Sequence, residues 1–361
     1  MELLGAHRAT EKRKDEHIEL FESGGPRFRN KTTLLEEVDL VPRALPGTSL
    51  DEVDLRTEFL GRSMNAPVLI SSMTGGTSTA GKVNMELAEV AAELGLGIGL
   101  GSQRAMLENP ARAKDYMLRH IAPDVFIGGN IGIAQVIQAE TKKIVNAVDI
   151  VGADALFVHL NPAMEAVQVE GDSNFKRSLE SLSRLVEELD VPVIIKEVGS
   201  GIDPVTARSV ADAGVRIVDV AGAGGTSWVG VEALRGRASG EAGGLGETFW
   251  DWGIPTAACL MMLDGTGLDL IGSGGLRTGL DAAKCLALGA KLCGVAGPVM
   301  EAYLSGGRKG CAGFLRKFIE ELRLAVFLTG CKSFKELVDS PRVIGPVLWA
   351  WTRQALKKEG R

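Results

Sequence analysis

The stretch VPVIIKEVGSGIDPVTARSVADAGVRIVDVAG, residues 191–222, holds two short apolar runs separated by a helical segment. The runs VPVIIKEV (191–198) and VRIVDVAG (215–222) are rich in Val and Ile and too short for helices, which is typical of buried parallel strands. Between them, Asp203 and Pro204 provide a helix N-cap followed by proline, and the segment VTARSVADAG stops at Gly214. This stretch therefore predicts a strand–helix–strand unit.

The same pattern continues on both sides of this unit. Asn109 and Pro110 provide another N-cap and proline, and predict a helix over ARAKDYMLRH. Eight strand–helix units between residues 67 and 298 predict an α/β fold, a closed (β/α)₈ barrel. A doubly wound open sheet shares the local pattern, but the count of eight favours the barrel. The other six runs are PVLIS (67–71), LGIGLGS (96–102), VFIGGN (125–130), ALFVHL (155–160), LDLIGSGG (268–275) and LCGVAGP (292–298).

The barrel divides the chain into three parts. Residues 1–66 are predicted to form an irregular N-terminal extension that closes over the active site, and residues 67–298 the barrel. Residues 299–361 are predicted to form helices that pack on the barrel, with an amphipathic stretch FLRKFIEELRLAVFL. The late apolar run VIGPVLWAW (343–351) is broken by Gly345 and Pro346, so we interpret it as packing or subunit contact. It predicts a homo-oligomer, a tetramer or an octamer.

Composition excludes several classes of function. The net charge of −6 argues against a nucleic-acid-binding protein. No apolar run approaches the ~18 residues of a membrane span, and the charged start has no apolar signal region. The five cysteines form no C-x-x-C pair, which argues against a zinc site or a disulfide framework and fits a reducing cytoplasm.

Nearly every predicted strand ends in residues capable of chemistry. In a barrel these strand ends meet at one face, the C-terminal mouth, where barrel active sites are built. Turn formation alone would explain any single one of these loops, but it explains eight together poorly. The strand ends are Met73-Thr74-Gly75-Gly76, Gly101-Ser102-Gln103-Arg104, Gly129-Asn130, His159-Leu160-Asn161, Lys196-Glu197, Gly224-Gly225-Thr226, Gly274-Gly275-Leu276-Arg277 and Ala296-Gly297.

Three of these ends predict a ligand that carries phosphate and a charged ring. Gly274-Gly275 and Ala296-Gly297 follow strands 7 and 8, where this fold usually cradles phosphate on backbone N–H groups. Lys196 ends an apolar run, so its ammonium needs a partner. A pair with Glu197 is disfavoured because adjacent strand residues point to opposite faces. We therefore favour the pyrimidine edge of a flavin, which becomes negative on reduction.

Two glycine-rich segments resemble nucleotide motifs but do not complete them. GTSTAGKV (76–83) nearly fits a P-loop, but Val83 has no hydroxyl for Mg²⁺. GLGIGLG (95–101) is followed by Ser-Gln-Arg, where we expect no helix to open, so it is not a Rossmann fingerprint. Its glycines are expected to permit tight packing.

The chain resembles the type 2 isopentenyl diphosphate isomerases, which are FMN-dependent barrel enzymes. The similarity runs from Arg13 to about Leu337, and its motifs are specific as an ordered set although each is weak alone. They are R-K-x-x-H-I (13–18), MTGG (73–76), GSQR (101–104), HLN (159–161), EGD (170–172), VIIKEVG (193–199), GAGGTSW (222–228), DWGIPTA (251–257), GSGGLR (272–277) and GVAGP (294–298).

This resemblance implies isomerisation of an isoprenoid diphosphate with FMN, Mg²⁺ and NADPH as the reductant. It places His159, Asn161 and position 164 in the catalytic set, and Glu165 at the Mg²⁺ ion. The substrate would be bound by Arg13, Lys14, Ser102, Gln103 and Arg104. The residues implied to hold FMN are Ser72, Met73, Thr74, Ser102, Asn130, Lys196, Thr226, Gly274, Gly275, Leu276, Ala296 and Gly297.

One position departs from the family. The family reads H-L-N-x-x-Q-E after strand 4, and this chain has Met164 in place of the Gln beside Glu165. A Gln side chain can hydrogen-bond the substrate or relay a proton, and a thioether does neither well. This departure predicts an altered reaction or rate.

Three functions remain open. In the family's reaction a proton is moved across an isolated double bond, for which this chain offers no obvious carboxylate or Cys acid, and reduced FMN would serve at N5. A 2-hydroxy acid oxidase would need an H-G-G-R-like turn, whereas the comparable loops GAGGTSW and GSGGLR have no His. The third function is a divergent FMN barrel that acts on a related diphosphate or serves as a regulatory module, which Met164 alone supports.

Overall fold

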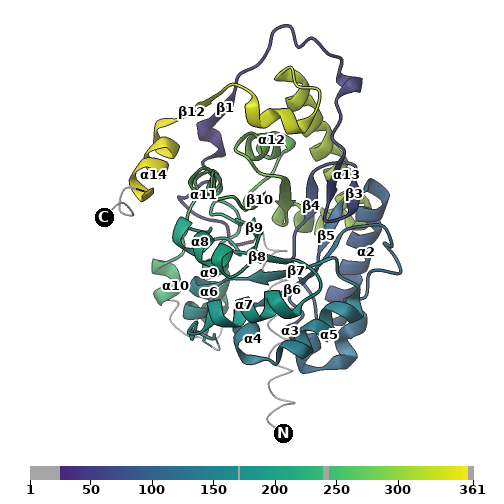
Figure 1. Ribbon diagram of the computed structural model, residues 1–361, viewed down its shortest axis with the longest axis vertical. Coiled ribbons are helices and arrows are strands. Elements are labelled where there is room, and N and C mark those ends of the chain that lie inside the picture. The colour runs from purple at the N-terminus through teal and green to yellow at the C-terminus, as the bar shows by residue number, and fades with distance from the viewer. Residues whose placement is uncertain (1–24, 170, 239–243, 357–361) are drawn as a thin grey trace.

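The computed structural model describes residues 25–169, 171–238 and 244–356, and its centre is a closed barrel of eight strands (Figure 1). Neighbouring strands are parallel, and β11 pairs with β4 through Gly294 and Leu69, which closes the barrel. The predicted barrel and its eight runs are confirmed, and an open sheet is excluded. The strands are β4 (Val68–Ile70), β5 (Gly97–Gly99), β6 (Ile127–Gly132), β7 (Ala155–His159), β8 (Val193–Lys196), β9 (Ile217–Asp219), β10 (Asp269–Ser273) and β11 (Leu292–Val295).

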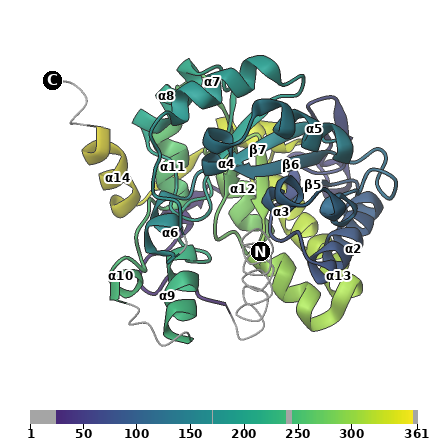
Figure 2. The same cartoon turned by 90° about the horizontal axis from the view of Figure 1, so that it is seen from below.

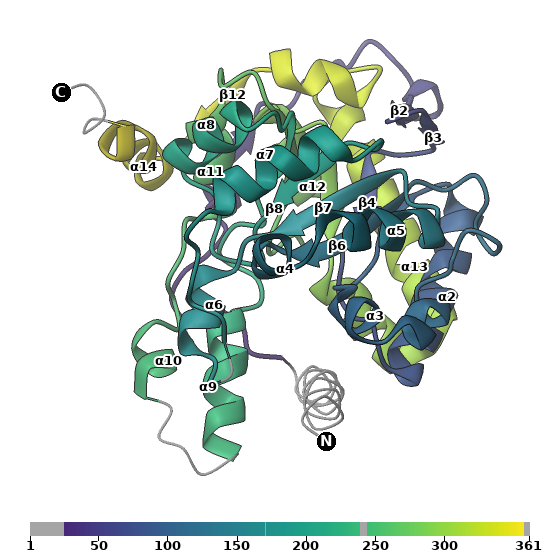
Figure 3. The same ribbon diagram turned by 60° about the horizontal axis from the view of Figure 1, so that its bottom comes forward.

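Helices surround the strands and explain why the strand sequences are apolar on both faces. The ring consists of α2 (Ser78–Leu94), η3 (Pro110–Asp115), α5 (Thr141–Val151), α7 (Ser178–Glu188), α8 (Pro204–Asp212), α11 (Thr256–Leu263), α12 (Gly279–Ala287) and α13 (Gly297–Leu328). Shorter helices follow several strands, and Figure 3 shows three of them, α6, α9 and α10, grouped together at one side. The shorter helices are α3 (Arg104–Glu108), α4 (Ile133–Gln138), α6 (Pro162–Val167), α9 (Trp228–Ala238) and α10 (Gly244–Thr248).

The two predicted N-caps are present, but one helix is shorter than expected. The Asp203 carboxylate accepts from the backbone N–H of Val205 and Thr206 at the start of α8. Asn109 also caps, yet the segment after it is the 3₁₀-helix η3 rather than a helix over ARAKDYMLRH. The chain leaves the helical path at Tyr116, whose buried hydroxyl donates to the Ser102 carbonyl at 2.7 Å.

The two glycine-rich segments have structural roles. Lys82 lies on α2 with its side chain 72% exposed, and it is not among the residues that line the mouth pocket. A short helix, α3, does open directly after GLGIGLGSQ, so our expectation of no helix there was wrong. A Cβ atom on Gly101 would lie 2.0 Å from the Thr74 carbonyl oxygen, so this glycine permits close packing of two mouth loops.

The N-terminal extension reaches both ends of the barrel. Its hairpin, β2 (Thr57–Phe59) and β3 (Arg62–Met64), lies at the N-terminal end, because Arg62 binds Asp154 immediately before β7. Phe59 packs edge-on against Phe126, with ring centroids 4.9 Å apart. This part of residues 1–66 therefore covers the N-terminal end of the barrel rather than the active-site mouth. The extension also contains η1 (Leu35–Glu37), β1 (Val38–Leu40) and η2 (Leu50–Glu52).

The C-terminal segment begins within the helical ring. Helix α13 starts at Gly297 and packs against both α12 and α2, so it completes the ring (Figure 2). Strand β12 (Arg342–Ile344) then pairs antiparallel with β1. This pairing connects the N-terminal extension to the C-terminal segment outside the barrel. The segment also contains η4 (Phe334–Asp339) and α14 (Pro346–Leu356). None of the helices in the described ranges is long and apolar enough to cross a membrane.

Candidate active site

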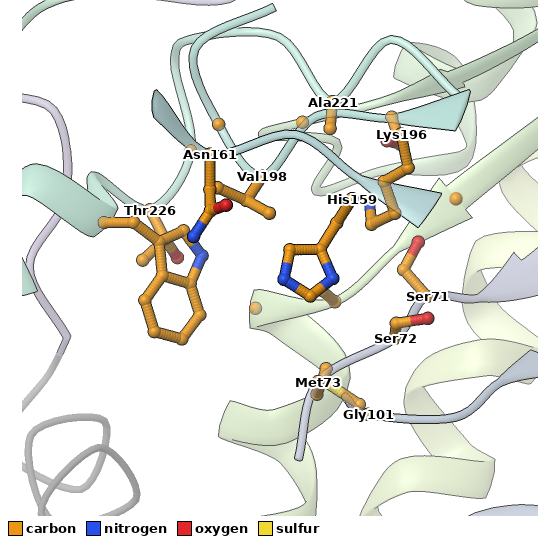
Figure 4. Close-up of a pocket in the computed structure, with 18 of the residues that line it drawn as sticks. Ser71, Ser72, Met73, Gly101, His159, Asn161, Lys196, Val198, Ala221 and Thr226 are labelled. Carbon is orange, nitrogen blue, oxygen red and sulfur yellow. The ribbon is translucent and has the colours of Figure 1, made fainter. Parts of the chain in front are cut away.

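A pocket occupies the C-terminal mouth of the barrel, where the sequence placed the site (Figure 4). The loops after all eight strands contribute to it, together with Arg27 from the N-terminal extension. In the view of Figure 4 the His159 ring lies between the Asn161 amide and the Ser71 and Ser72 side chains. The residues of this one pocket therefore come from every part of the barrel sequence.

The structure brings most of the predicted residues together. Met164 and Glu165 line the pocket with the other residues implied by the family pattern. Arg13 and Lys14 lie outside the described residues. The other predicted site residues that line the pocket are Ser72, Met73, Thr74, Ser102, Arg104, Asn130, His159, Asn161, Lys196, Thr226, Gly274, Gly275, Leu276, Ala296 and Gly297.

Gln103 is the exception among the described residues. Its side chain is 2% exposed and lies in the barrel wall, where Oε1 accepts from the Asn130 backbone N–H at 2.9 Å. Its Nε2 atom donates to the Ala147 carbonyl oxygen at 3.2 Å. Gln103 thus does not line the pocket in this structure, and both ends of its amide are bonded within the barrel wall.

One end of the pocket is built from backbone that can approach an anion closely. Gly274 and Gly275 have φ values of 98° and 79°, a region that favours glycine. A Cβ atom on Gly274 would lie 2.2 Å from the Gly222 carbonyl oxygen, so the loops after β9 and β10 pack backbone to backbone. Beside them α13 begins at Gly297, and its N-terminal N–H groups favour negative charge.

Arginines add positive charge near this cradle. Arg277 and Arg27 both line the pocket, and burial together with Arg27 lowers the pKa of Arg277. Arg27 is fixed by Glu301 of α13, with 2.7 Å between nitrogen and oxygen. These groups fit a terminal phosphate at this end of the pocket.

A buried ion pair lies on the barrel wall at the other end of the cradle. The Lys196 Nζ atom is 3.0 Å from Asp219 Oδ2, and the side chains are 8% and 1% exposed. Ser273 donates its hydroxyl to the other Asp219 oxygen. The partner of Lys196 within the protein is thus Asp219, which the sequence analysis missed because it considered only the neighbouring Glu197.

Glu197 has a separate role. Its carboxylate accepts hydrogen bonds from the backbone N–H groups of Val198, Gly199 and Ser200, which fixes the loop after β8. Burial raises the pKa of Glu197 to about 7. It therefore shapes the loop that carries Val198 and Gly199 to the pocket.

Two serine hydroxyls provide a test of whether a flavin fits. Ser71 and Ser72 both line the pocket, and their Oγ atoms are buried with no hydrogen-bond partner among the described residues. Buried hydroxyls are normally bonded, so these two indicate a ligand with polar edges. The hydroxyls, the Lys196 ammonium and the glycine cradle together fit the ring and the phosphate of FMN.

Strand β7 places His159 beside Lys196 of β8, and further polar side chains follow it in the chain. His159 Nδ1 is 2.8 Å from Asn130 Oδ1, and since an amide oxygen only accepts, Nδ1 carries the proton. The Asn161 Nδ2 atom donates to Glu165 Oε1 at 2.9 Å and lies 3.8 Å from the Met164 sulfur. The backbone N–H of Asp172 donates to Glu165 Oε2 at 2.7 Å.

The donor set at Glu165 fits a partly hydrated Mg²⁺ ion. Within the described ranges no group of three or more His, Cys, Asp or Glu side chains could hold a metal. Mg²⁺ is commonly held by one or two carboxylates together with substrate phosphates, and keeps several waters. Each Glu165 oxygen accepts one hydrogen bond, which leaves a carboxylate further capacity to bind a cation.

Comparisons with known proteins identify the family of the chain. A family model described as FMN-dependent dehydrogenase matches residues 6–160 and 134–344. The isopentenyl-diphosphate delta-isomerase of Methanosarcina mazei is 42% identical over 97% of this chain and 95% of its own. The enzyme of the same name from Methanothermobacter thermautotrophicus is also 42% identical, over 95% of each chain.

Solved structures show the same fold at lower identity. Mandelate oxidase with (S)-2-phenylpropionate is 22% identical, has a TM-score of 0.63, and covers 95% of this chain and 98% of its own. At this identity the likeness shows the barrel alone. The matches over nearly the full length show that the chain belongs to the FMN-dependent dehydrogenase family and, within it, to the isopentenyl-diphosphate delta-isomerases.

Proposed function

We propose that the protein interconverts isopentenyl diphosphate and dimethylallyl diphosphate by a 1,3-allylic proton shift. The observation that carries this proposal is the arrangement of one pocket. A glycine cradle and a buried ammonium fit FMN, and the strand next to Lys196 carries His159, with Asn161 and Glu165 after it. The identity to curated isomerases over nearly the whole chain supports the same reaction.

The residues on the flavin side bind and orient the cofactor. When bound in its reduced form, FMN supplies a proton donor at N5 and an electron-rich ring. The Lys196 ammonium favours negative charge on the pyrimidine edge, and Asp219 holds that ammonium in place. The Asn130 amide oxygen accepts a hydrogen bond from His159 Nδ1, which fixes the orientation of the imidazole.

The residues on the substrate side bind the diphosphate. Glu165 and a diphosphate would repel each other, so a divalent cation between them balances the charge, and Mg²⁺ suits an all-oxygen set. Arg104 lines the pocket on this side together with Ser102. Arg13, Lys14, the Mg²⁺ ion and NADPH as the reductant are part of this proposal.

The 2-hydroxy acid oxidase is the less favoured function. It needs a His base and a neighbouring Arg in one turn, and the loop GSGGLR provides Arg277 without a His. His159 is the only His among the described residues that line the pocket, and it lies on another strand. The likeness to mandelate oxidase at 22% identity concerns the fold and carries no argument for its reaction.

A turnover assay tests the proposal directly. The protein reconstituted with FMN is reduced without oxygen and incubated with labelled isopentenyl diphosphate and Mg²⁺. We expect labelled dimethylallyl diphosphate without net oxidation of the flavin. Flavin oxidation in step with a 2-hydroxy acid would support the oxidase, and binding of the diphosphate without any conversion would support the regulatory module.

Lys196→Met is expected to weaken FMN binding and to make the flavin potential more negative. The ammonium favours the negative charge of reduced flavin, so its loss disfavours reduction. Fluorescence titration gives the FMN affinity, and a reference-dye titration gives the potential. If both values match those of the wild type, Lys196 does not lie at the pyrimidine edge.

The double variant Arg13→Ala with Lys14→Ala is expected to raise KM for the diphosphate about tenfold or more, because hydrogen bonds to charged groups are lost. FMN affinity should not change. Lys82→Ala is a matched control, since Lys82 is exposed and lies outside the pocket lining. An unchanged KM in the double variant would remove both residues from the substrate site.

We also propose a homo-oligomer, a tetramer or an octamer. Apolar side chains of β12 and α14 are exposed together, with Val343 at 58%, Val347 at 50% and Trp349 at 46%. A patch of this kind fits a second copy of the chain. Light scattering should give a mass above 38.2 kDa, and Val347→Glu should lower it. A monomer at working concentration would contradict this prediction.

A further inference from the structure

We propose that Gln168 is a substrate-binding residue, whose side-chain amide contacts the diphosphate and the water around its Mg²⁺ ion. This inference rests on the proposed function. Gln168 lines the pocket but is only 6% exposed. Its Oε1 and Nε2 atoms have no hydrogen-bond partner among the described residues. A buried amide with neither end bonded is uncommon, and this one faces a ligand pocket.

The backbone fixes where this amide lies. Gln168 follows α6, and its N–H donates to the Met164 carbonyl at 2.9 Å. Its own carbonyl accepts from Gly171, at the turn that returns Asp172 to Glu165. A Cβ atom on Gly171 would lie 1.9 Å from the Glu165 carbonyl oxygen, so only glycine allows this turn. Gln168 is therefore held on the side of Glu165.

The position along α6 decides which part of the substrate Gln168 meets. His159 ends β7 at the barrel wall, and α6 leads away from it. Gln168 is the C-cap residue directly after α6. The turn that follows it brings the Asp172 N–H to Glu165, so the proposed metal ligand and Gln168 are joined by one turn. Because the metal would bind the diphosphate, we place Gln168 at the diphosphate end of the substrate.

The chemistry of an amide suits this partner. A diphosphate offers only acceptors, which the Gln168 Nε2 atom can satisfy. The Oε1 atom needs a donor, and a water bound to Mg²⁺ provides one, since this ion keeps several waters. The isoprenoid chain has neither donors nor acceptors. An amide also adds no charge beside Glu165, so it does not compete for the cation.

Gln103 provides a matched control for this proposal. It is the same residue type, 2% exposed, and both ends of its amide are bonded within the barrel wall. Removing a bonded amide leaves its partners unsatisfied, whereas removing an unbonded one does not. We therefore expect Gln103→Met to lower Tm, and Gln168→Met to leave Tm unchanged or to raise it.

The binding experiment uses the FMN-loaded protein with Mg²⁺, and inorganic pyrophosphate and isopentenyl diphosphate as probes in calorimetry. For Gln168→Met we expect Kd to rise about tenfold or more for both probes, with FMN content unchanged. An unchanged Kd would overturn the proposal, as would a lower Tm with loss of FMN. A fall in kcat alone, with Kd unchanged, would also overturn it by placing Gln168 at the reacting carbons.

The outcome for Gln168 can be separated from the outcome for the proposed function. Loss of pyrophosphate affinity in Gln168→Met is measured without any turnover. If the wild type fails to convert isopentenyl diphosphate, the proposed reaction is wrong, and the pyrophosphate result still decides whether Gln168 binds a diphosphate.

Discussion

Asp219→Asn is expected to lower the free energy of unfolding by about 3–5 kcal/mol, because it leaves the Lys196 ammonium buried without its carboxylate. The Lys196 and Asp219 side chains are 8% and 1% exposed, so the ammonium is largely withdrawn from water. Ser273 also loses the charged acceptor of its hydroxyl. Urea unfolding of the protein without FMN measures this change, since no ligand then contributes to stability.

Two further variants make this prediction specific. Asp54 forms an exposed pair with Arg56, at 46% and 77% side-chain exposure, so Asp54→Asn should leave the stability nearly unchanged. The double variant Lys196→Met with Asp219→Leu removes both charges and should recover most of the lost stability. A change within about 0.5 kcal/mol for Asp219→Asn, the usual range of surface substitutions, would show that the pair does not hold the site together.

The barrel could be predicted because its signals are local. Each strand is a short apolar run, and each turn after it contains glycine or polar residues, so eight repeats define the fold. The same repeats place the strand ends at one mouth, which is where the pocket lies. The short helices of the mouth follow from loop packing instead, and α3 was missed for that reason.

The partner of Lys196 could not be predicted in the same way. Lys196 and Asp219 are 23 residues apart and meet because β8 and β9 pair with these two residues in register. Register follows from the closed barrel and not from either strand alone. By contrast, Gln103 lies between Ser102 and Arg104, which both line the pocket. Gln103 precedes α3 and lies outside any strand, so its direction follows from the fold of this loop and not from strand alternation.

The hairpin of β2 and β3 and the role of Gln168 could not be predicted from the sequence for a different reason. Residues 57–64 are polar enough to be assigned to a mouth extension, and only the Arg62–Asp154 pair and the Phe59–Phe126 contact place them at the other end. Gln168 lies in none of the sequence motifs that point to the site. Its absence of partners is a property of the folded pocket, so it becomes visible only in the structure.

Met164→Gln is expected to raise kcat for the isomerisation of isopentenyl diphosphate. Met164 lines the pocket, and its sulfur lies 3.8 Å from the Asn161 amide nitrogen, where a Gln oxygen would accept a stronger hydrogen bond. A positioned proton-transfer partner commonly contributes ~10²–10⁴-fold in rate. Substrate and FMN binding should be retained, because Glu165 and the glycine cradle are unchanged. Single-turnover kinetics with reduced enzyme measures the chemical step.

Met164→Leu separates polarity from packing at this position. Leu keeps an apolar side chain of similar volume, so we expect its kcat to stay near the wild-type value while that of Met164→Gln rises. Equal rates in all three proteins would mean that Met164 packs against the isoprenoid methyl group without a role in proton transfer. Activity in none of them would mean that the pocket differs from its relatives at more than this residue. That result would favour flavin chemistry on a related diphosphate.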